Sequence, residues 1–176
     1  VMVGSILCNG VDPEERGGYF IIKGTERVLI AQERMNYNHI YVFKQNNGDI
    51  VAECRSVKED ADYSTNLRCR PSKYGLVCTV PYLKLDVNLN DVLCILAPSF
   101  VPYEPVRTAL QWTARSKDEA CQRIIEKLTS AKRRNPRYIE QIIHHEICAH
   151  LGMSASGHER CMYLCLMVDQ IIAVKN

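Results

Sequence analysis

The sequence predicts an α+β fold in which N-terminal antiparallel strands and hairpins are followed by a helical half. Aromatic and β-branched runs, separated by turn residues, fill residues 17–80. Apolar residues at helical spacing dominate the chain from Asn90 onward. We find no internal repeat and no low-complexity tract. Strands first and helices second are typical of the α+β class.

The first two strands are predicted on either side of a tight turn at Lys23–Gly24, after a loop-like segment over residues 1–16. Residues 19–22 read Tyr-Phe-Ile-Ile, and residues 28–31 read Val-Leu-Ile-Ala. Such residues suit a pleated, half-buried surface. We therefore expect two buried strands here.

Two further hairpins are predicted downstream of these strands. Asn46-Asn-Gly-Asp49 is a hairpin turn signal, and Pro71-Ser-Lys73 is a second turn. The expected strands cover residues 38–43, 50–55, 67–70 and 76–80, with a surface loop over 57–66.

Five helices are predicted in the second half from caps and apolar spacing. They are 91–97 capped by Asn90, a helix from Pro105 to about Trp112, one after Ser116, one from Asn135-Pro136 to Gly152, and one after Ser156. Ser116 and Ser156 each begin a capping box. The last helix is apolar nearly all round, so we expect it to be buried centrally.

The composition is that of an ordinary globular chain of 176 residues with a net charge of +2. No overall field attracts nucleic acid, so any such contact must come from locally placed Lys and Arg. We see no signal peptide and no apolar run long enough to cross a bilayer. The chain starts at Val1 and ends after an apolar helix, which favours a piece of a longer polypeptide.

Nine cysteines occur in the sequence, none of them in a Cys-x-x-Cys pair. Most lie inside apolar runs, where a free cysteine behaves as a small hydrophobic residue. We expect reduced core thiols in a cytosol or nucleus rather than a disulfide framework.

Metal chemistry is suggested only weakly by His144-His-Glu-Ile-Cys-Ala-His150. A zincin motif would place a second histidine at position 149, which is alanine. His158, Cys161 and Cys165 share a helix face but lack a fourth ligand, so core thiols are favoured. An exposed helix face is favoured for the histidines. We predict no catalytic residue and no metal ligand.

Residues 17–43 carry the most specific signal, reading GGYFIIKGTERVLIAQERMNYNHIYVF. This stretch resembles the second-largest (β-like) subunit of multisubunit DNA-directed RNA polymerase, most like the RNA polymerase II type. Thr25 and Arg27 replace the family's Ser and Lys. The resemblance continues at Glu53–Ser56 and Thr79–Lys84, and more loosely in the final helices.

The resemblance implies that residues 1–36 end the protrusion domain and that residues 37–176 are the lobe domain. The lobe would form one wall of the downstream DNA cleft and a docking face for other subunits and factors. Expected partners are the DNA template and DNA–RNA hybrid, the largest polymerase subunit, a small zinc-ribbon subunit and initiation factors, with no membrane. The expected location is the nucleus, or a cytoplasmic viral factory or virion.

The resemblance also implies that this part of the subunit is inactive alone and holds no cofactor. Catalytic Mg²⁺ in the parent nucleotidyltransferase is bound mainly by the largest subunit. Asp60, Asp62 and Asp86 lack the tight Asp-x-Asp grouping that binds this ion, which fits the expectation.

Arg27 and Arg34, followed by Lys23, are the predicted nucleic-acid contacts. The family's basic residue at the position of Arg27 lies toward the nucleic-acid cleft. A second basic group, Lys132–Arg134 with Arg137, is either a solvated helix end or a phosphate contact. Two other functions stay open, a stand-alone protein-interaction module and a helical metalloenzyme.

Overall fold

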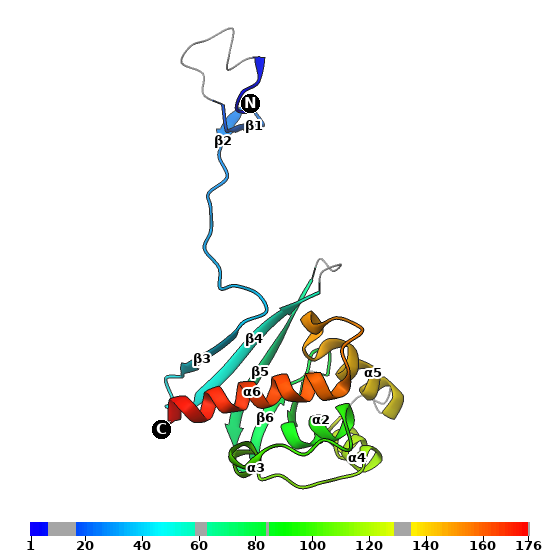
Figure 1. The fold of residues 1–176 in the computed structure, drawn as a ribbon. Coiled ribbons are helices and arrows are strands. Elements are labelled where there is room, and N and C mark those ends of the chain that lie inside the picture. The colour runs from blue at the N-terminus through cyan, green and yellow to red at the C-terminus, as the bar shows by residue number, and fades with distance from the viewer. Residues whose placement is uncertain (7–16, 59–62, 84, 129–134, 176) are drawn as a thin grey trace. The chain divides into compact units, whose positions relative to one another are not determined.

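The computed structural model describes residues 1–6, 17–58, 63–83, 85–128 and 135–175. They form two compact units, Val1–Met35 and Asn36–Asn176. Among the described residues, antiparallel strands precede five α-helices, which confirms the predicted α+β class (Figure 1). None of the described helices is long and apolar enough to cross a membrane.

The first unit contains one short hairpin of β1 (Phe20–Ile22) and β2 (Thr25–Arg27). The turn at Lys23–Gly24 is as predicted, but the second strand precedes the apolar run over 28–31, which has no regular structure. The prediction of buried strands is also wrong, since Phe20 is 51% exposed and Leu29 is 83% exposed. Among the described residues of this unit, the two strands have no second layer against which to bury a face.

The second unit is built on a five-stranded sheet in which each strand pairs antiparallel with the next along the chain. Its strands are β3 (Ile40–Lys44), β4 (Ile50–Val57), β5 (Ser64–Ser72), β6 (Gly75–Thr79) and β7 (Asp86–Asn88). Both predicted hairpins are confirmed. Strand β7 was not predicted. The predicted loop over 57–66 is too long, because β4 continues to Val57 and β5 begins at Ser64, and residues 59–62 lie outside the described residues.

The helices of this unit are α2 (Leu89–Leu96), α3 (Glu104–Leu110), α4 (Lys117–Lys127), α5 (Pro136–Glu146) and α6 (Gly157–Lys175). The predicted capping serines are confirmed, because Ser116 and Ser156 accept hydrogen bonds from the amides of Glu119 and Glu159. The predicted cap Asn90 is wrong. Asn88 caps α2 instead and accepts a hydrogen bond from the Asn90 amide at 2.9 Å.

The end of α5 departs from the predicted end at Gly152. The helix ends at Glu146, Cys148 adopts a left-handed φ of 52°, and a 3-10 turn η2 (Ala149–Leu151) follows. The buried guanidinium of Arg160 donates to the carbonyls of Ile147, Cys148 and Gly152 at 2.7, 2.8 and 2.5 Å. A charged donor from α6 therefore binds the carbonyls of Ile147 and Cys148, which a helix continued to Gly152 would have paired internally, and also that of Gly152.

Helix α6 buries one face only, which corrects the expectation of central burial. Leu164, Met167 and Val168 are fully buried, whereas Met162 and Leu166 are 50% and 47% exposed. The helix lies across β3 and β4 and against α2 and α3.

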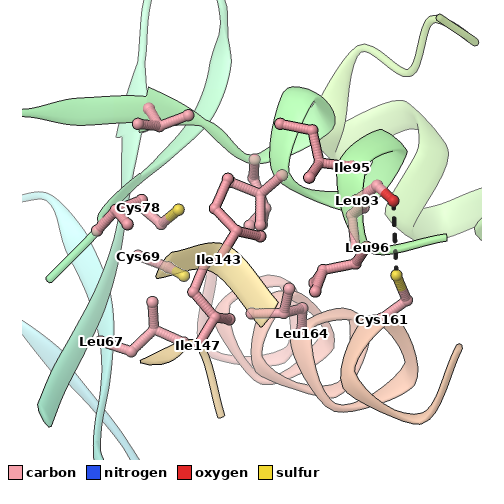
Figure 2. Packing of buried hydrophobic residues seen from close by; sticks show 14 of the residues in the cluster. Leu67, Cys69, Cys78, Leu93, Ile95, Leu96, Ile143, Ile147, Cys161 and Leu164 are labelled. Atoms are coloured by element: carbon pink, nitrogen blue, oxygen red, sulfur yellow. Dashed lines mark hydrogen bonds between the residues drawn. The ribbon is translucent and has the colours of Figure 1, made fainter. Parts of the chain in front are cut away.

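The core lies between the inner face of the sheet and the helices (Figure 2). In the figure, Leu67, Cys69 and Cys78 extend from the strands toward Ile143, Ile147 and Leu164. The eight described cysteines are free and buried, as predicted for core thiols. Cys8 lies outside the described residues.

Candidate nucleic-acid interface

The β1–β2 hairpin presents two of the three predicted nucleic-acid contacts. Ile22 pairs with Thr25, so Lys23 and Gly24 form a two-residue turn in which both φ angles are positive, at 52° and 74°. This turn matches the twist of an antiparallel pair, and glycine makes its second position easy to adopt. The Lys23 side chain is exposed at the tip of the hairpin.

Arg27 lies at the other end of the hairpin, opposite Phe20. Cross-strand partners share a face, so Arg27 lies beside an exposed aromatic ring, whereas Glu26 lies on the opposite face. Arg34 is also exposed but lies in a stretch without regular structure. No ion pair or hydrogen bond of the described residues joins these three cations to one another or to an acid.

Lys23, Arg27 and Arg34 can contact phosphate, but the net positive charge around them is small. Exposed arginine and lysine bind a nucleic-acid backbone without reading its sequence, in a manner that weakens with salt. Glu26 and Glu33 lie next to Arg27 and Arg34 in the sequence, which limits the local positive charge. Of the second basic group, Lys132–Arg134 lies outside the described residues, and Arg137 is exposed near the start of α5.

A second arginine-rich surface, which the sequence analysis missed, lies on the sheet face that points away from the core. The Arg68 guanidinium lies 5.8 Å from the centre of the Phe43 ring, and the Arg55 guanidinium lies 5.7 Å from that of Tyr37. Both are cation–π distances. We call these four residues the outer arginine face.

Part of this sheet face is neutralised internally. Arg70 pairs with Asp86, and Asn66 donates to the Glu53 carboxylate at 2.7 Å. Arg68, in contrast, has a buried Nε without a hydrogen-bond partner. The sequence contains a pattern from which the position of Arg68 could have been predicted. Arg68 and Arg70 alternate with the buried Leu67 and Cys69, so the two arginines share the opposite face of the sheet.

Of the histidines at 144, 145 and 150, His150 does not lie on the exposed helix face that was expected. His150 lies in η2, and its Nδ1 is 2.8 Å from the buried Ser56 hydroxyl. Its ring packs edge-on against Tyr163, whose hydroxyl lies 3.2 Å from the Cys54 sulfur. Burial lowers the pKa of His150, and the nearby Arg160 charge lowers it further.

Metal-ligating side chains do not gather in the part of the chain that the structure describes. No group of three or more His, Cys, Asp or Glu there is placed to hold a metal ion. His158 packs edge-on against Phe100, with ring centres 4.9 Å apart, and the Cys161 thiol donates to the Leu93 carbonyl at 3.7 Å (Figure 2). These contacts are those of core packing.

Comparison with known proteins gives a match to the family model for the RNA polymerase beta subunit over residues 6–169. DNA-directed RNA polymerase II subunit 2 of Arabidopsis thaliana is 38% identical over 94 residues, covering 46% of this chain and 8% of that protein. A probable RNA polymerase II subunit RPB2 homolog of Invertebrate iridescent virus 3 is 31% identical over 122 residues, covering 60% of this chain and 10% of that protein.

A further relative spans the chain from end to end. The probable RPB2 homolog of Invertebrate iridescent virus 6 is 24% identical over 222 residues, covering 100% of this chain and 19% of that protein. The chain thus corresponds to less than a fifth of the length of these relatives.

Proposed function

The chain belongs to the RNA polymerase beta subunit family, and we propose that it forms the lobe domain and the end of the protrusion domain of a DNA-directed RNA polymerase. The observation that carries this proposal is the family match over residues 6–169, together with the GGYFII segment at its start. Residues 1–36 are assigned to the protrusion and residues 37–176 to the lobe. The division of the described chain into units at Met35 and Asn36 supports this boundary.

The proposed role is mechanical and electrostatic. The parent enzyme joins ribonucleotides on a DNA template, and this part of it forms one wall of the cleft that holds downstream DNA. Arg27, Arg34 and Lys23 contact the phosphate backbone, because their exposed charges have no described partner within the chain. A polymerase has to hold every sequence, so contacts without base readout suit it.

Docking of other subunits and factors is the second part of the proposed role. The partners are the largest subunit, which supplies most of the Mg²⁺ ligands, a small zinc-ribbon subunit and initiation factors. The outer arginine face supports this part, since exposed aromatic residues and arginine are enriched at protein interfaces. The relatives include a plant protein and viral proteins, so the proposed location is the nucleus or a viral factory or virion.

Affinity purification tests this function. An epitope tag is placed on the gene product that contains this sequence, in the cells or virus that carry it. We expect the largest polymerase subunit to co-purify in equal amount, with template-dependent RNA synthesis in the eluate. A product that purifies without a second polymerase subunit and without this activity would favour the alternative, a stand-alone interaction module.

A further inference from the structure

A concave site of about 420 Å³ lies beside the C-terminal end of α5, within the Asn36–Asn176 unit. We call it the Glu146 pocket. It includes two tyrosines, a carboxylate and a lysine, and the lining residues that matter here are Lys58, Tyr82, Tyr138, His145 and Glu146. None of them belongs to the three predicted DNA contacts or to the outer arginine face.

Glu146 gives the pocket a carboxyl group that forms no ion pair with the described residues. Its Oε2 atom is buried and has no hydrogen-bond partner. Its backbone is held in place, because the Thr65 hydroxyl donates to the Glu146 carbonyl at 3.3 Å. A carboxylate oxygen that has lost water without gaining a donor is costly, so a rotation of the Glu146 carboxylate toward a donor brought by a ligand would be favoured.

The cations near the pocket do not pair with the Glu146 carboxylate, so it can bind a cationic ligand. Glu146 is the last residue of α5, and the carbonyl end of a helix carries partial negative charge that attracts cations. The nearby Arg160 guanidinium is bound to the carbonyls of Ile147, Cys148 and Gly152. Lys58 lines the pocket without an ion pair to Glu146 in the described structure.

Two tyrosine rings complete the site. Tyr82 is 52% exposed and is held at a φ of 65°, and Tyr138 is 36% exposed on α5. Partial burial raises the pKa of Tyr82, and the Glu146 charge raises it further, which indicates that the two groups are close. Aromatic faces beside a carboxylate are a recognised arrangement for binding an organic cation.

We propose that the Glu146 pocket binds an arginine side chain of a partner polypeptide. A planar guanidinium can donate to the Glu146 carboxylate while lying against a tyrosine ring, which an ammonium group does less well. Lys58 lines the same pocket, and its positive charge repels an arginine ligand. The proposal depends only on the Asn36–Asn176 unit and stands or falls separately from the polymerase assignment.

A peptide titration of the 176-residue chain tests the pocket. The probes are acetyl-Gly-Arg-Gly-amide and the same peptide with citrulline, which keeps the shape of arginine without its charge. We expect the arginine peptide to shift the amide NMR signals of Tyr82, Tyr138 and Glu146. It should bind about tenfold more tightly than the citrulline peptide, equivalent to about 1.4 kcal/mol. Equal affinities, or shifts elsewhere only, would overturn the proposal.

Substitutions in the chain sharpen the test. Glu146→Gln should weaken binding of the arginine peptide about tenfold, whereas Glu126→Gln, an exposed carboxylate of α4, should leave it unchanged. Lys58→Met should strengthen binding, since a repelling positive charge is removed. If Glu146→Gln does not fold, Tyr138→Leu serves in its place and should weaken binding severalfold. Unchanged affinity in the folded variant would contradict the proposal.

Discussion

Several charged side chains of the second unit are held by partners inside the chain. Asp91 is only 1% exposed and pairs with Arg115 and Arg123, at 3.1 and 3.4 Å, which links α2 to α4 and to the segment before it. Arg160 is buried and binds three carbonyls. These arginines bind groups within the chain. Lys23, Arg27 and Arg34 are exposed and form no ion pair among the described residues, so they are better candidates for contact with another molecule.

Replacing Arg160 with methionine tests its structural role. Arg160→Met keeps most of the buried volume but removes the charged donor from the carbonyls of Ile147, Cys148 and Gly152. The Cys148 carbonyl would keep the Leu151 amide as a donor, at 3.1 Å. We expect the free energy of unfolding to fall by about 2–4 kcal/mol in urea denaturation. The control Arg107→Met removes an exposed pair with Glu104 and should cost less than about 1 kcal/mol. Equal losses would contradict the account.

His150 should make the fold sensitive to acid. Its pKa is lowered in the folded chain by burial and by Arg160, so the unfolded chain binds the proton more readily. Stability from this group is therefore complete at neutral pH and is lost as pH falls below the ordinary histidine value of about 6.5. His144, whose pKa is also lowered, contributes in the same direction.

Urea unfolding between pH 7.5 and 5 measures this effect. The chain should lose stability as the pH falls, and His150→Gln should lose less over the same interval. His39→Gln, which changes an exposed histidine, is the control and should keep the full pH dependence. An identical pH slope in the His150 variant would show that this histidine is not the sensitive group.

The predicted phosphate contacts can be tested by charge reversal in the assembled polymerase. Arg27→Glu with Arg34→Glu should shorten the half-life of the elongation complex on its template, and the difference from the unchanged enzyme should become smaller as salt rises, because salt screens the electrostatic contacts that are lost. The physical reason is the loss of two phosphate contacts and the gain of two repulsive carboxylates. The control is Lys127→Glu with Lys175→Glu, which makes the same change in net charge. A half-life unchanged at every salt concentration would contradict these contacts.

At the scale of elements, the close approach of α6 to α2 depends on a glycine. A Cβ on Gly157 would overlap the carbonyl of Leu96, a backbone group that cannot rotate away. Gly157→Ala should therefore separate the two helices and cost about 2 kcal/mol or more in chemical denaturation. The control Gly48→Ala has open space around it and carries only the strain of a positive φ, so it should cost about 1 kcal/mol. A smaller loss at Gly157 than at Gly48 would contradict this packing.

The sequence predicted correctly the turns and helix caps that depend only on neighbouring residues. The Asn46–Asp49 turn and the Ser116 and Ser156 caps all form, since each needs only neighbouring residues. The end of α5 was missed because Arg160, thirteen residues beyond Ile147, supplies the donors that replace helical pairing. A hydrogen bond between residues this far apart in the sequence produces no repeating pattern of apolar residues from which it could be predicted.

Burial was predicted less well than secondary structure. The apolar runs around Lys23–Gly24 were expected inside the molecule, yet they are exposed in a two-stranded unit. The outer arginine face and the orphan oxygen of Glu146 were both missed, because each depends on side chains from elements distant in the sequence. Strand alternation could have placed Arg68 on the outer face, but its aromatic partner could not have been identified in this way.

At the scale of the whole molecule, the family match identifies the kind of protein, whereas the proposed DNA contacts depend on how the chain is placed in a complete polymerase. The family match over residues 6–169 establishes that the chain belongs to the RNA polymerase beta subunit family. The chain covers less than a fifth of the length of its plant and viral relatives. A position along the DNA is a property of the complete enzyme. It therefore has to be measured in the assembled polymerase.

Photocrosslinking of the elongating enzyme tests the central claim most directly. Photoreactive groups are placed on single phosphates of the template duplex, upstream and downstream of the growing RNA end, and the crosslinked peptides are mapped. We predict crosslinks to residues 1–176 from downstream phosphates, including peptides that contain Arg27 or Arg34. Crosslinks from every downstream position that fall only outside this chain would contradict its assignment as a wall of the DNA cleft.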